Sequence, residues 1–307
     1  MTETAELRRR LEELRQLAQE SGIDAAKEFE EIEVKIDAGS RAETTWKRVE
    51  LARHPERPYA MDYISRIFDG FIELHGDRAF VDDPAVIGGL AFLDGRPVTV
   101  LANQKGRTLK ENMFRNHGMA NPEGYRKALR LAHQAEKFRR PIITFVDTSG
   151  AYPGLGAEER GIGEAIARNL RDFSQIRTPV ICVIIGEGGS GGALGISVGD
   201  KIYMLENAIY SVISPEGCAS ILLRDSTRAK DAAVMLRITS SDLLQFKVIN
   251  GIISEPPGGA HTDPDAAARS IKEILTRDIS DLCSRNPSVL VRYRNQKIRK
   301  AGHWREE

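Results

Sequence analysis

The chain has 307 residues, which is enough for one large domain with attachments or for two modest domains. Lysine plus arginine and aspartate plus glutamate each number 44, so net charge gives no general argument for a nucleic-acid partner or an acidic one. No apolar run approaches the ~20 residues of a membrane helix, the N-terminus has no apolar signal-peptide core, and the three scattered cysteines lack metal-ligand spacing. We therefore expect a soluble cytoplasmic protein with no metal of its own.

Residues 1–54 are predicted to form a helical extension at the N-terminus. The first part is highly charged and carries Leu7, Leu11, Leu14 and Leu17 at helical spacing, which makes a narrow apolar stripe. The stripe is too thin to form a core of its own. We therefore favour packing of this helix on the body of the protein or on another chain over a solvated arm.

Residues 55–255 are predicted to form the main domain, which contains a β-hairpin near its start. The apolar runs 86–93 and 97–102 flank Asp94-Gly95-Arg96, a sequence that suits a tight turn. The next segment is predicted to be a loop, and it carries four cations, Lys105, Arg107, Lys110 and Arg115. They are expected either to face solvent or to attract a carboxylate, a phosphate group or a partner.

The centre of the chain repeats one pattern twice. The β-branched runs Ile142–Val146 and Val180–Ile185 are strand-like, begin 38 residues apart, and each leads through a glycine-rich turn into a helical segment. This spacing is expected of parallel strands joined by crossovers. The two turns should therefore lie on one rim of a sheet, where α/β proteins bind ligands, and their helix starts should favour anionic oxygens.

Beyond the second turn, the alternation of strands and helices continues and indicates an α/β fold. Residues 256–307 are predicted to form a C-terminal helical segment with one amphipathic helix and a basic tail. The expected elements are strands over 201–205 and 208–213, helices from Pro215 and over 228–247, a strand over 248–254 and a helix over 265–282.

The second turn, Gly186–Gly192, admits several interpretations. It matches the dinucleotide-binding pattern GxGxxG, but three predicted strands precede it and the helix after it is short. It also matches GxSxG, the nucleophile elbow of serine hydrolases, with Ser190 as nucleophile and His261 or His303 as base. A tight connection without a ligand is the structural alternative, although five glycines in seven residues cost more conformational entropy than a plain turn requires.

The interpretation that we favour uses the backbone of this turn. Consecutive N–H groups at Gly191 and Gly192, at a helix start, would form an oxyanion hole for an enolate or carbonyl oxygen. The first turn, in the sequence DTSGAYPG, would add a second set of donors on the same rim. Two such turns at the ends of consecutive strands are therefore predicted to carry the chemistry.

Several segments between about Leu51 and His261 indicate membership of one protein family. In chain order they are LARHPERPY, QKGR, GMANPEGYRKALRLA, DTSGAYPGLGAEERG, EGGSGGAL, VGDK and YSVISPEGCASIL. Together they resemble the carboxyltransferase alpha subunit of bacterial multisubunit acetyl-CoA carboxylase, although Ser149 stands where that family more usually has proline. The resemblance implies a crotonase-like (ClpP/crotonase) α/β fold of repeated ββα units behind the helical extension.

The resemblance also implies an activity and its partners. The expected reaction transfers a carboxyl group from carboxybiotin on a carrier protein to acetyl-CoA, giving malonyl-CoA, the first committed step of fatty acid synthesis. This chain is expected to bind no cofactor itself, with biotin as a co-substrate and zinc on a separate beta subunit. The expected partners are that beta subunit in an α2β2 assembly, the biotin carboxyl carrier protein and biotin carboxylase, with no membrane. A serine hydrolase that uses Ser190 is the alternative.

Mapping this chemistry onto the sequence gives the candidate site residues. Two anionic oxygens need positioned N–H donors, one in each half of the reaction. Gly191 and Gly192 are expected to be the main donors, with Gly150 and Ala151 as further donors or shape-setting residues. Contacts to carboxybiotin or CoA are expected from Lys105, Arg107, Tyr152, Gly188 and Gly189. The sequence leaves open which turn serves the biotin half and which the acyl-CoA half.

Overall fold

A computed structural model describes residues 3–21 and 26–302. The chain packs as two compact units, one made of Met1–Arg48 with Pro215–Arg237 and the other of Val49–Ser214 with Ile238–Glu307. Each unit is considered by itself. The domain boundaries at residues 54 and 255 remain predictions, because packing units and domains are not defined in the same way. None of the described helices combines the length and apolar character that crossing a membrane requires.

The smaller unit contains the predicted N-terminal helices. Helix α1 (Glu3–Glu20) is joined to α2 (Ala26–Ala52) by ion pairs from Arg8 to Asp37 and from Arg15 to Glu33, both 2.6 Å long. Of the predicted leucine stripe, Leu11 is buried, whereas the other three leucines are exposed. The stripe is therefore only partly covered within this unit.

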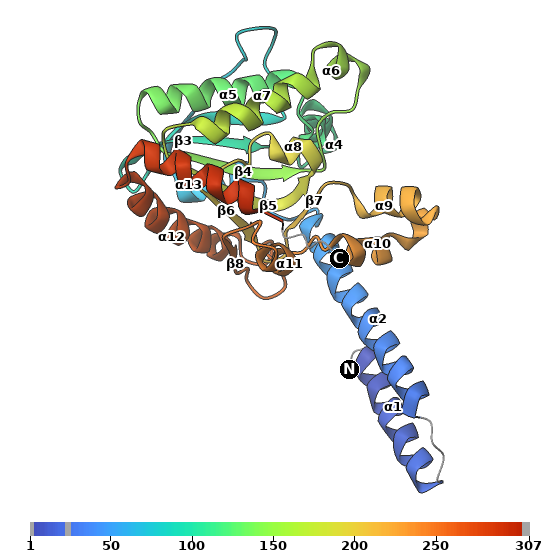
Figure 1. Cartoon of the computed structure of the whole chain (residues 1–307). Coiled ribbons are helices and arrows are strands. Elements are labelled where there is room, and N and C mark those ends of the chain that lie inside the picture. Colours follow the sequence, from blue (N-terminus) through green and yellow to red (C-terminus); the bar gives the residue numbers. More distant parts are fainter. Residues whose placement is uncertain (1–2, 22–25, 303–307) are drawn as a thin grey trace. The chain divides into compact units, whose positions relative to one another are not determined.

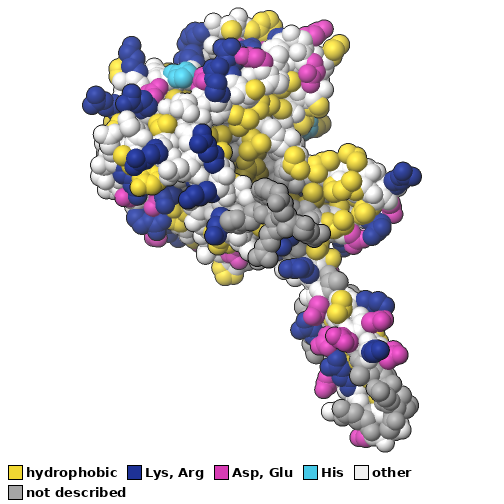
Figure 2. Space-filling view, in the orientation of Figure 1, with side chains coloured by type: hydrophobic (Ala, Val, Ile, Leu, Met, Phe, Trp, Pro, Cys, Tyr) yellow, Lys and Arg dark blue, Asp and Glu magenta, His cyan; other side chains and the backbone are white. Residues whose placement is uncertain are grey.

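The same unit includes a short helical segment from the middle of the sequence. Its elements are α9 (Pro215–Cys218), η2 (Ala219–Leu223), η3 (Ser226–Arg228) and α10 (Ala229–Leu236). Figure 2 shows hydrophobic side chains gathered over α9 and α10. Ile221, Leu222 and Met235 belong to this segment, and each residue is more than 60% exposed. An apolar surface of this kind is typical of interaction sites.

The larger unit is built on one mixed sheet in the order β1-β2-β3-β4-β5-β6-β8, with β7 paired to β5 (Figure 1). Strands β1 to β3 are antiparallel and the remaining pairs are parallel. The strands are β1 (Asp69–Glu73), β2 (Val86–Leu93), β3 (Arg96–Asn103), β4 (Ile142–Thr148), β5 (Val180–Gly189), β6 (Lys201–Leu205), β7 (Ile209–Ser211) and β8 (Gly251–Ile253). The predicted α/β class is confirmed.

The predicted hairpin is also confirmed. Strands β2 and β3 pair from Val86↔Asn103 to Leu93↔Arg96, which leaves Asp94 and Gly95 as a two-residue turn. Both turn residues have positive φ, 47° and 79°, the combination that a type I′ turn requires. Asp-Gly supplies it because aspartate tolerates the left-handed region and glycine adopts it without strain.

Helices cover both faces of the sheet. Helices α5 (Pro122–Lys137) and α7 (Ile162–Gln175) run side by side on one face, as Figure 1 shows. Helix α3 (Ala60–Ile67) lies on the other face, where Tyr63 and Phe68 contact Phe145 of β4, and it packs against α12 (Pro264–Cys283). The core of the unit lies between these layers. Shorter helices complete the unit: α4 (Leu109–Phe114), η1 (Asn116–Gly118), α6 (Leu155–Glu159), α8 (Ser190–Leu194) and α11 (Ser240–Gln245).

One local prediction is wrong, and one is extended by the structure. The basic segment after β3 is not entirely a loop, since Thr108 caps α4 by accepting a hydrogen bond from the N–H of Glu111. The basic C-terminal tail is helical over α13 (Pro287–Lys300). Arg294 fixes that helix, because its buried guanidinium pairs with Asp200 at 2.6 Å. The same guanidinium donates to the carbonyl oxygens of Phe173, Ile176 and Thr178.

Candidate functional site

The two glycine turns lie side by side at the carboxyl ends of β4 and β5. These strands pair in parallel from Ile142↔Val180 to Thr148↔Gly188, so the chain leaves both at the same rim. A Cβ atom built on Gly189 would lie 2.0 Å from the carbonyl oxygen of Ser149. One built on Gly192 would lie 2.3 Å from the carbonyl carbon of Gly150. The backbones of the two turns are therefore in direct contact, and only glycine permits this approach.

The second turn is shorter than the sequence indicates. Strand β5 continues to Gly189, because Glu187, Gly188 and Gly189 pair with β7. A Cβ on Gly186 would lie 2.5 Å from an oxygen of Asp147, and one on Gly188 would lie 2.8 Å from the ring of Tyr210. Close packing within the protein thus explains Gly186 and Gly188 without a ligand.

The change of direction itself occurs at Ser190. This residue has a φ of 50° and begins the short helix α8. The N–H groups in the first turn of a helix have no acceptor in a preceding turn. Gly191 and Gly192 occupy that first turn, and Gly191 is only partly buried. Their N–H groups are thus placed as the predicted donors would be.

The first turn is organised by Thr148. Its hydroxyl donates to the carbonyl oxygen of Gly150 at 2.7 Å and accepts a hydrogen bond from the N–H of Gly150 at 3.2 Å. The N–H of Tyr152 donates to the carbonyl oxygen of Ala120. Ala151 lies between them, and its nitrogen is 2.5 Å from the Cβ position built on Gly192. Of the two predicted donors in this turn, Gly150 therefore already has an acceptor for its N–H.

The two predicted anion-binding cations are both engaged by carboxylates. The ammonium nitrogen of Lys105 lies 2.7 Å from Asp147 and 3.3 Å from Glu187. Arg107 pairs with Asp62 at 2.5 Å, and its guanidinium carbon lies 4.1 Å from the centre of the Tyr59 ring. Both cations are thus already paired with carboxylates of this chain.

Comparison with known proteins gives the family. The acetyl co-enzyme A carboxylase carboxyltransferase-like family model matches residues 2–302. The chain belongs to this family. It is 67% identical over 296 residues to the acetyl-coenzyme A carboxylase carboxyl transferase subunit alpha of Treponema denticola, covering 96% of this chain and 97% of that relative. It is 50% identical to the same subunit of Fusobacterium nucleatum over 97% of this chain and 96% of that one. We refer to it as the alpha chain.

Solved structures confirm the crotonase-like carboxyltransferase fold. Transcarboxylase 12S aligns with a TM-score of 0.56 at 21% identity, covering 70% of the alpha chain and 40% of that chain. A Pseudomonas malonate decarboxylase hetero-tetramer in complex with coenzyme A aligns with a TM-score of 0.58 at 16% identity, covering 70% and 89%. At these identities the likeness concerns the fold. The predicted activity as a carboxyltransferase alpha subunit is established by the closer relatives.

The alternative serine hydrolase has an elbow-like strand–turn–helix at Ser190, but no base reaches this serine among the residues that the structure describes. His261 stacks on His54, with ring centres 3.8 Å apart, and no hydrogen bond joins Ser190 to a histidine within residues 3–21 and 26–302. His303, the other predicted base, lies outside the described residues. A nucleophile elbow requires a base within hydrogen-bond reach of the serine.

We expect Ser190→Gly in the alpha chain to keep carboxyl-transfer turnover within about twofold of wild type, since the backbone donors remain. Glycine also adopts the φ of 50° without the cost of about 1–2 kcal/mol that an L-residue incurs there. Turnover, and labelling by a fluorophosphonate followed by mass spectrometry, check this expectation. An inactive but folded variant, together with stoichiometric labelling of wild type, would restore the hydrolase hypothesis.

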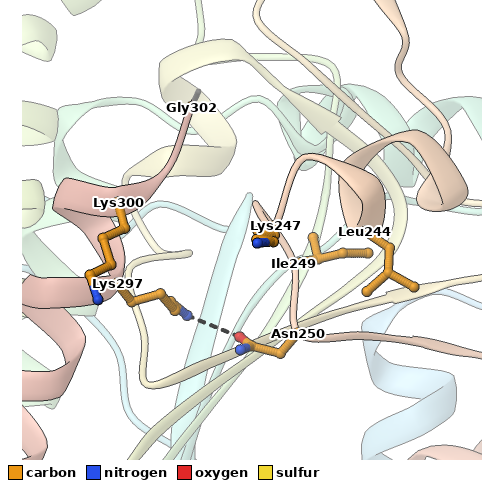
Figure 3. A pocket seen from close by; sticks show the side chains of 7 residues that line it. All are labelled: Leu244, Lys247, Ile249, Asn250, Lys297, Lys300 and Gly302. Atoms are coloured by element: carbon orange, nitrogen blue, oxygen red, sulfur yellow. Dashed lines mark hydrogen bonds between the residues drawn. The ribbon is translucent and has the colours of Figure 1, made fainter. Parts of the chain in front are cut away.

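A hollow of about 560 Å³ lies away from these turns (Figure 3). Lys297 projects into it and donates to Asn250 and to the carbonyl oxygens of Gly199 and Asp200. Burial lowers the pKa of Lys297 to about 8. Because Asp200 and Asn250 directly precede the parallel strands β6 and β8, this hollow lies at the edge of the sheet opposite to the glycine turns. It is therefore separate from the candidate site.

Three charged residues of the site were not predicted. Arg53, Asp147 and Glu187 join Lys105 beneath the turns. The sequence contains a signal for two of them, because an acidic residue stands at the end of each central strand, where a buried charge needs a partner. Across the described part of the chain, no group of three or more metal-ligating side chains occurs.

Proposed function

We propose that the alpha chain provides one of the two oxyanion sites used when a carboxyl group passes from carboxybiotin to acetyl-CoA. The backbone contact between Gly192 and Gly150 carries this proposal. It holds the first turn of α8 against the turn after β4, so the donors keep fixed positions. Donors that are already in place stabilise a developing negative charge without reorganisation.

The chain's own residues then have distinct roles. The N–H groups of Gly191 and Gly192 bind the oxygen that becomes negative, and Ala151 with Gly150 shapes the adjoining wall. A Cβ on Gly150 would meet nothing within 4 Å, so the space directly beside this residue is open. Tyr152 is partly buried next to this space and would bound it. Carboxybiotin, when bound as a co-substrate, would release carbon dioxide as its N–C bond breaks. The resulting biotin anion would take a proton from the acetyl methyl group, and the enolate carbon so formed would bond to the carbon dioxide.

The two cations take revised roles in this proposal. Lys105 serves the turns rather than a ligand, because both of its carboxylate partners lie near the carboxyl ends of the strands that lead into the turns. Arg107 is exposed and remains a candidate for contact with CoA phosphates at the rim. Gly188 and Gly189 act through packing against Tyr210 and Ser149 and do not touch the substrate.

We further propose that a beta subunit completes the site in an α2β2 assembly. The exposed Ile221, Leu222 and Met235 of the smaller unit, and the exposed leucines of α1, support a partner-binding surface. The biotin carboxyl carrier protein and biotin carboxylase would join the complex in the cytoplasm. Zinc would reside on the beta subunit, and this chain would hold no cofactor.

Reconstitution tests this function. The purified alpha chain, given malonyl-CoA and a free biotin derivative, should show negligible malonyl-CoA decarboxylation coupled to biotin carboxylation until a zinc-bearing beta subunit is added. The beta subunit alone is the control, and mass spectrometry verifies the purity of each preparation. Full turnover by the alpha chain alone would contradict the two-chain site.

A further inference from the structure

An ion cluster lies directly beneath the glycine turns. It is made of the buried or half-buried Lys105, Asp147 and Glu187, joined by Arg53 at its exposed side. The ammonium nitrogen of Lys105 lies 2.7 Å from Asp147 Oδ1 and 3.3 Å from Glu187 Oε2. Glu187 Oε1 accepts a second charged hydrogen bond, 2.8 Å long, from Arg53 Nε. The side chains of Lys105, Asp147 and Glu187 are at most 14% exposed. Among these four residues, each carboxylate therefore lies within ion-pair distance of at least one cation.

The two carboxylates stand at the points where the strands meet the turns. Asp147 is the second-last residue of β4, two positions before Ser149, and Glu187 lies in β5 three positions before Ser190. The strands are also joined between these residues, because the N–H of Glu187 donates to Asp147 Oδ1 at 3.0 Å. Asp147 therefore receives both this N–H and the Lys105 ammonium. A single side chain thus bridges the exits of both strands.

The bridge is favoured by its electrostatics. Burial acts to lower the pKa of Lys105, but the carboxylates of Asp147 and Glu187 outweigh it and hold that pKa above its ordinary value. Burial acts to raise the pKa of Glu187, and Lys105 and Arg53 reverse the effect, so the pKa lies below the usual range. The lysine is therefore charged at neutral pH. Removing its ammonium would leave two buried carboxylates facing each other with one cation, which disfavours the observed spacing.

We propose that Lys105 is a positioning residue for carboxyl transfer: its ammonium group bridges Asp147 and Glu187 and thereby sets the spacing between the turn after β4 and the turn after β5. The inference rests on the proposed function of those turns. Lys105 touches neither donor, so it acts through the strand ends. Since a displacement of about 1 Å in a catalytic constellation costs up to about a hundredfold in rate, loss of the bridge should appear mainly in kcat.

The test uses the assembled alpha–beta complex and two substitutions that remove the bridge. Lys105→Met should lower kcat about ten- to a hundredfold, with KM for malonyl-CoA within about twofold of wild type. The double variant Lys105→Met/Glu187→Gln removes one charge of each sign, so it avoids the unbalanced carboxylate if the single variant does not fold. It should lose kcat to a similar extent, because the bridge is still absent. Lys105→Arg, which keeps the cation, should recover most of the loss.

Lys127→Met is the matched control. Lys127 is a fully buried lysine paired with Asp82 at 2.5 Å, and it belongs to helix α5 rather than to the turns. Its loss should lower the melting temperature but leave kcat near wild type when assayed well below that temperature. Near-normal kcat in either folded bridge variant, or an equal loss in Lys127→Met, would overturn the proposal. Absence of carboxyl transfer in the wild-type complex would instead refute the proposed function.

Discussion

Replacing Gly192 with alanine is expected to lower the turnover of carboxyl transfer by about 10²–10³, the range for losing one oxyanion donor. The added methyl group would lie 2.3 Å from the carbonyl carbon of Gly150 and 2.5 Å from the nitrogen of Ala151. Backbone atoms cannot give way as a flexible side chain does, so the two turns must separate. The donors of α8 then move away from the oxygen that they stabilise, although the rest of the sheet keeps its packing.

Steady-state kinetics of the reconstituted complex measure this effect, with circular dichroism and size-exclusion chromatography to verify fold and assembly. Gly163→Ala is the matched control, because this glycine lies in α7 and a Cβ there would meet nothing within 4 Å. Gly191→Ala is a second comparison with Gly192→Ala. Both variants keep the backbone N–H, but the methyl group at position 191 would lie at an ordinary 3.6 Å from Ile166 and would not force the turns apart. Wild-type turnover in a well-assembled Gly192→Ala complex would contradict the donor assignment.

Arg57→Met is expected to give the largest loss of stability, about 3–5 kcal/mol in the free energy of unfolding, as for breaking a buried ion pair from one side. The Arg57 side chain is 1% exposed and bonds both oxygens of the fully buried Glu255, at 2.6 and 3.1 Å. It also donates to the carbonyl oxygen of Ile185 in β5 at 2.7 Å. Methionine fills a similar volume but leaves the Glu255 carboxylate without its cation.

Urea unfolding of wild type and variant at pH 7 measures the loss. Arg57→Met/Glu255→Gln is the companion variant, and it should recover part of the stability because no buried charge is left unpaired. Burial acts to raise the pKa of Glu255, but Arg57 holds it below the ordinary value of 4.5. The stabilisation from this pair is therefore fully present above pH 4.5 and is lost as pH falls through the lower folded-state value. A difference between wild type and Arg57→Met that grows in acid would be inconsistent with this pairing.

The sequence predicted those elements whose conformation depends mainly on the residues within them. Asp94-Gly95 predicted a two-residue turn because its residues tolerate positive φ, and the β-branched runs predicted β4 and β5. The end of β5 was missed, since glycines disfavour strands and only pairing with β7 extends the strand to Gly189. The C-terminal segment was predicted to be helical, but the contact that fixes α13 was not predicted, because Arg294 and Asp200 are 94 residues apart in sequence.

The candidate site shows the same division. Glycine density and the predicted helix start pointed to Gly191 and Gly192 as candidate donors, and the structure places both residues in the first turn of α8. The role of Lys105 could not be predicted from neighbouring residues, because its carboxylate partners lie 42 and 82 residues further along the chain. A cation in a polar segment looks the same in sequence whether it faces solvent or ends in a buried bridge. Only the tertiary contact distinguishes the two.

The backbone contact between residues 149–151 and the glycines at 189 and 192 also constrains how this protein can diversify. A side chain added to one turn can be accommodated only if the other turn retreats, so substitutions in the two segments should be strongly epistatic. Libraries that randomise one turn at a time would then return almost exclusively inactive variants. Joint randomisation of both segments would sample compensated pairs of substitutions that single-site scanning would miss.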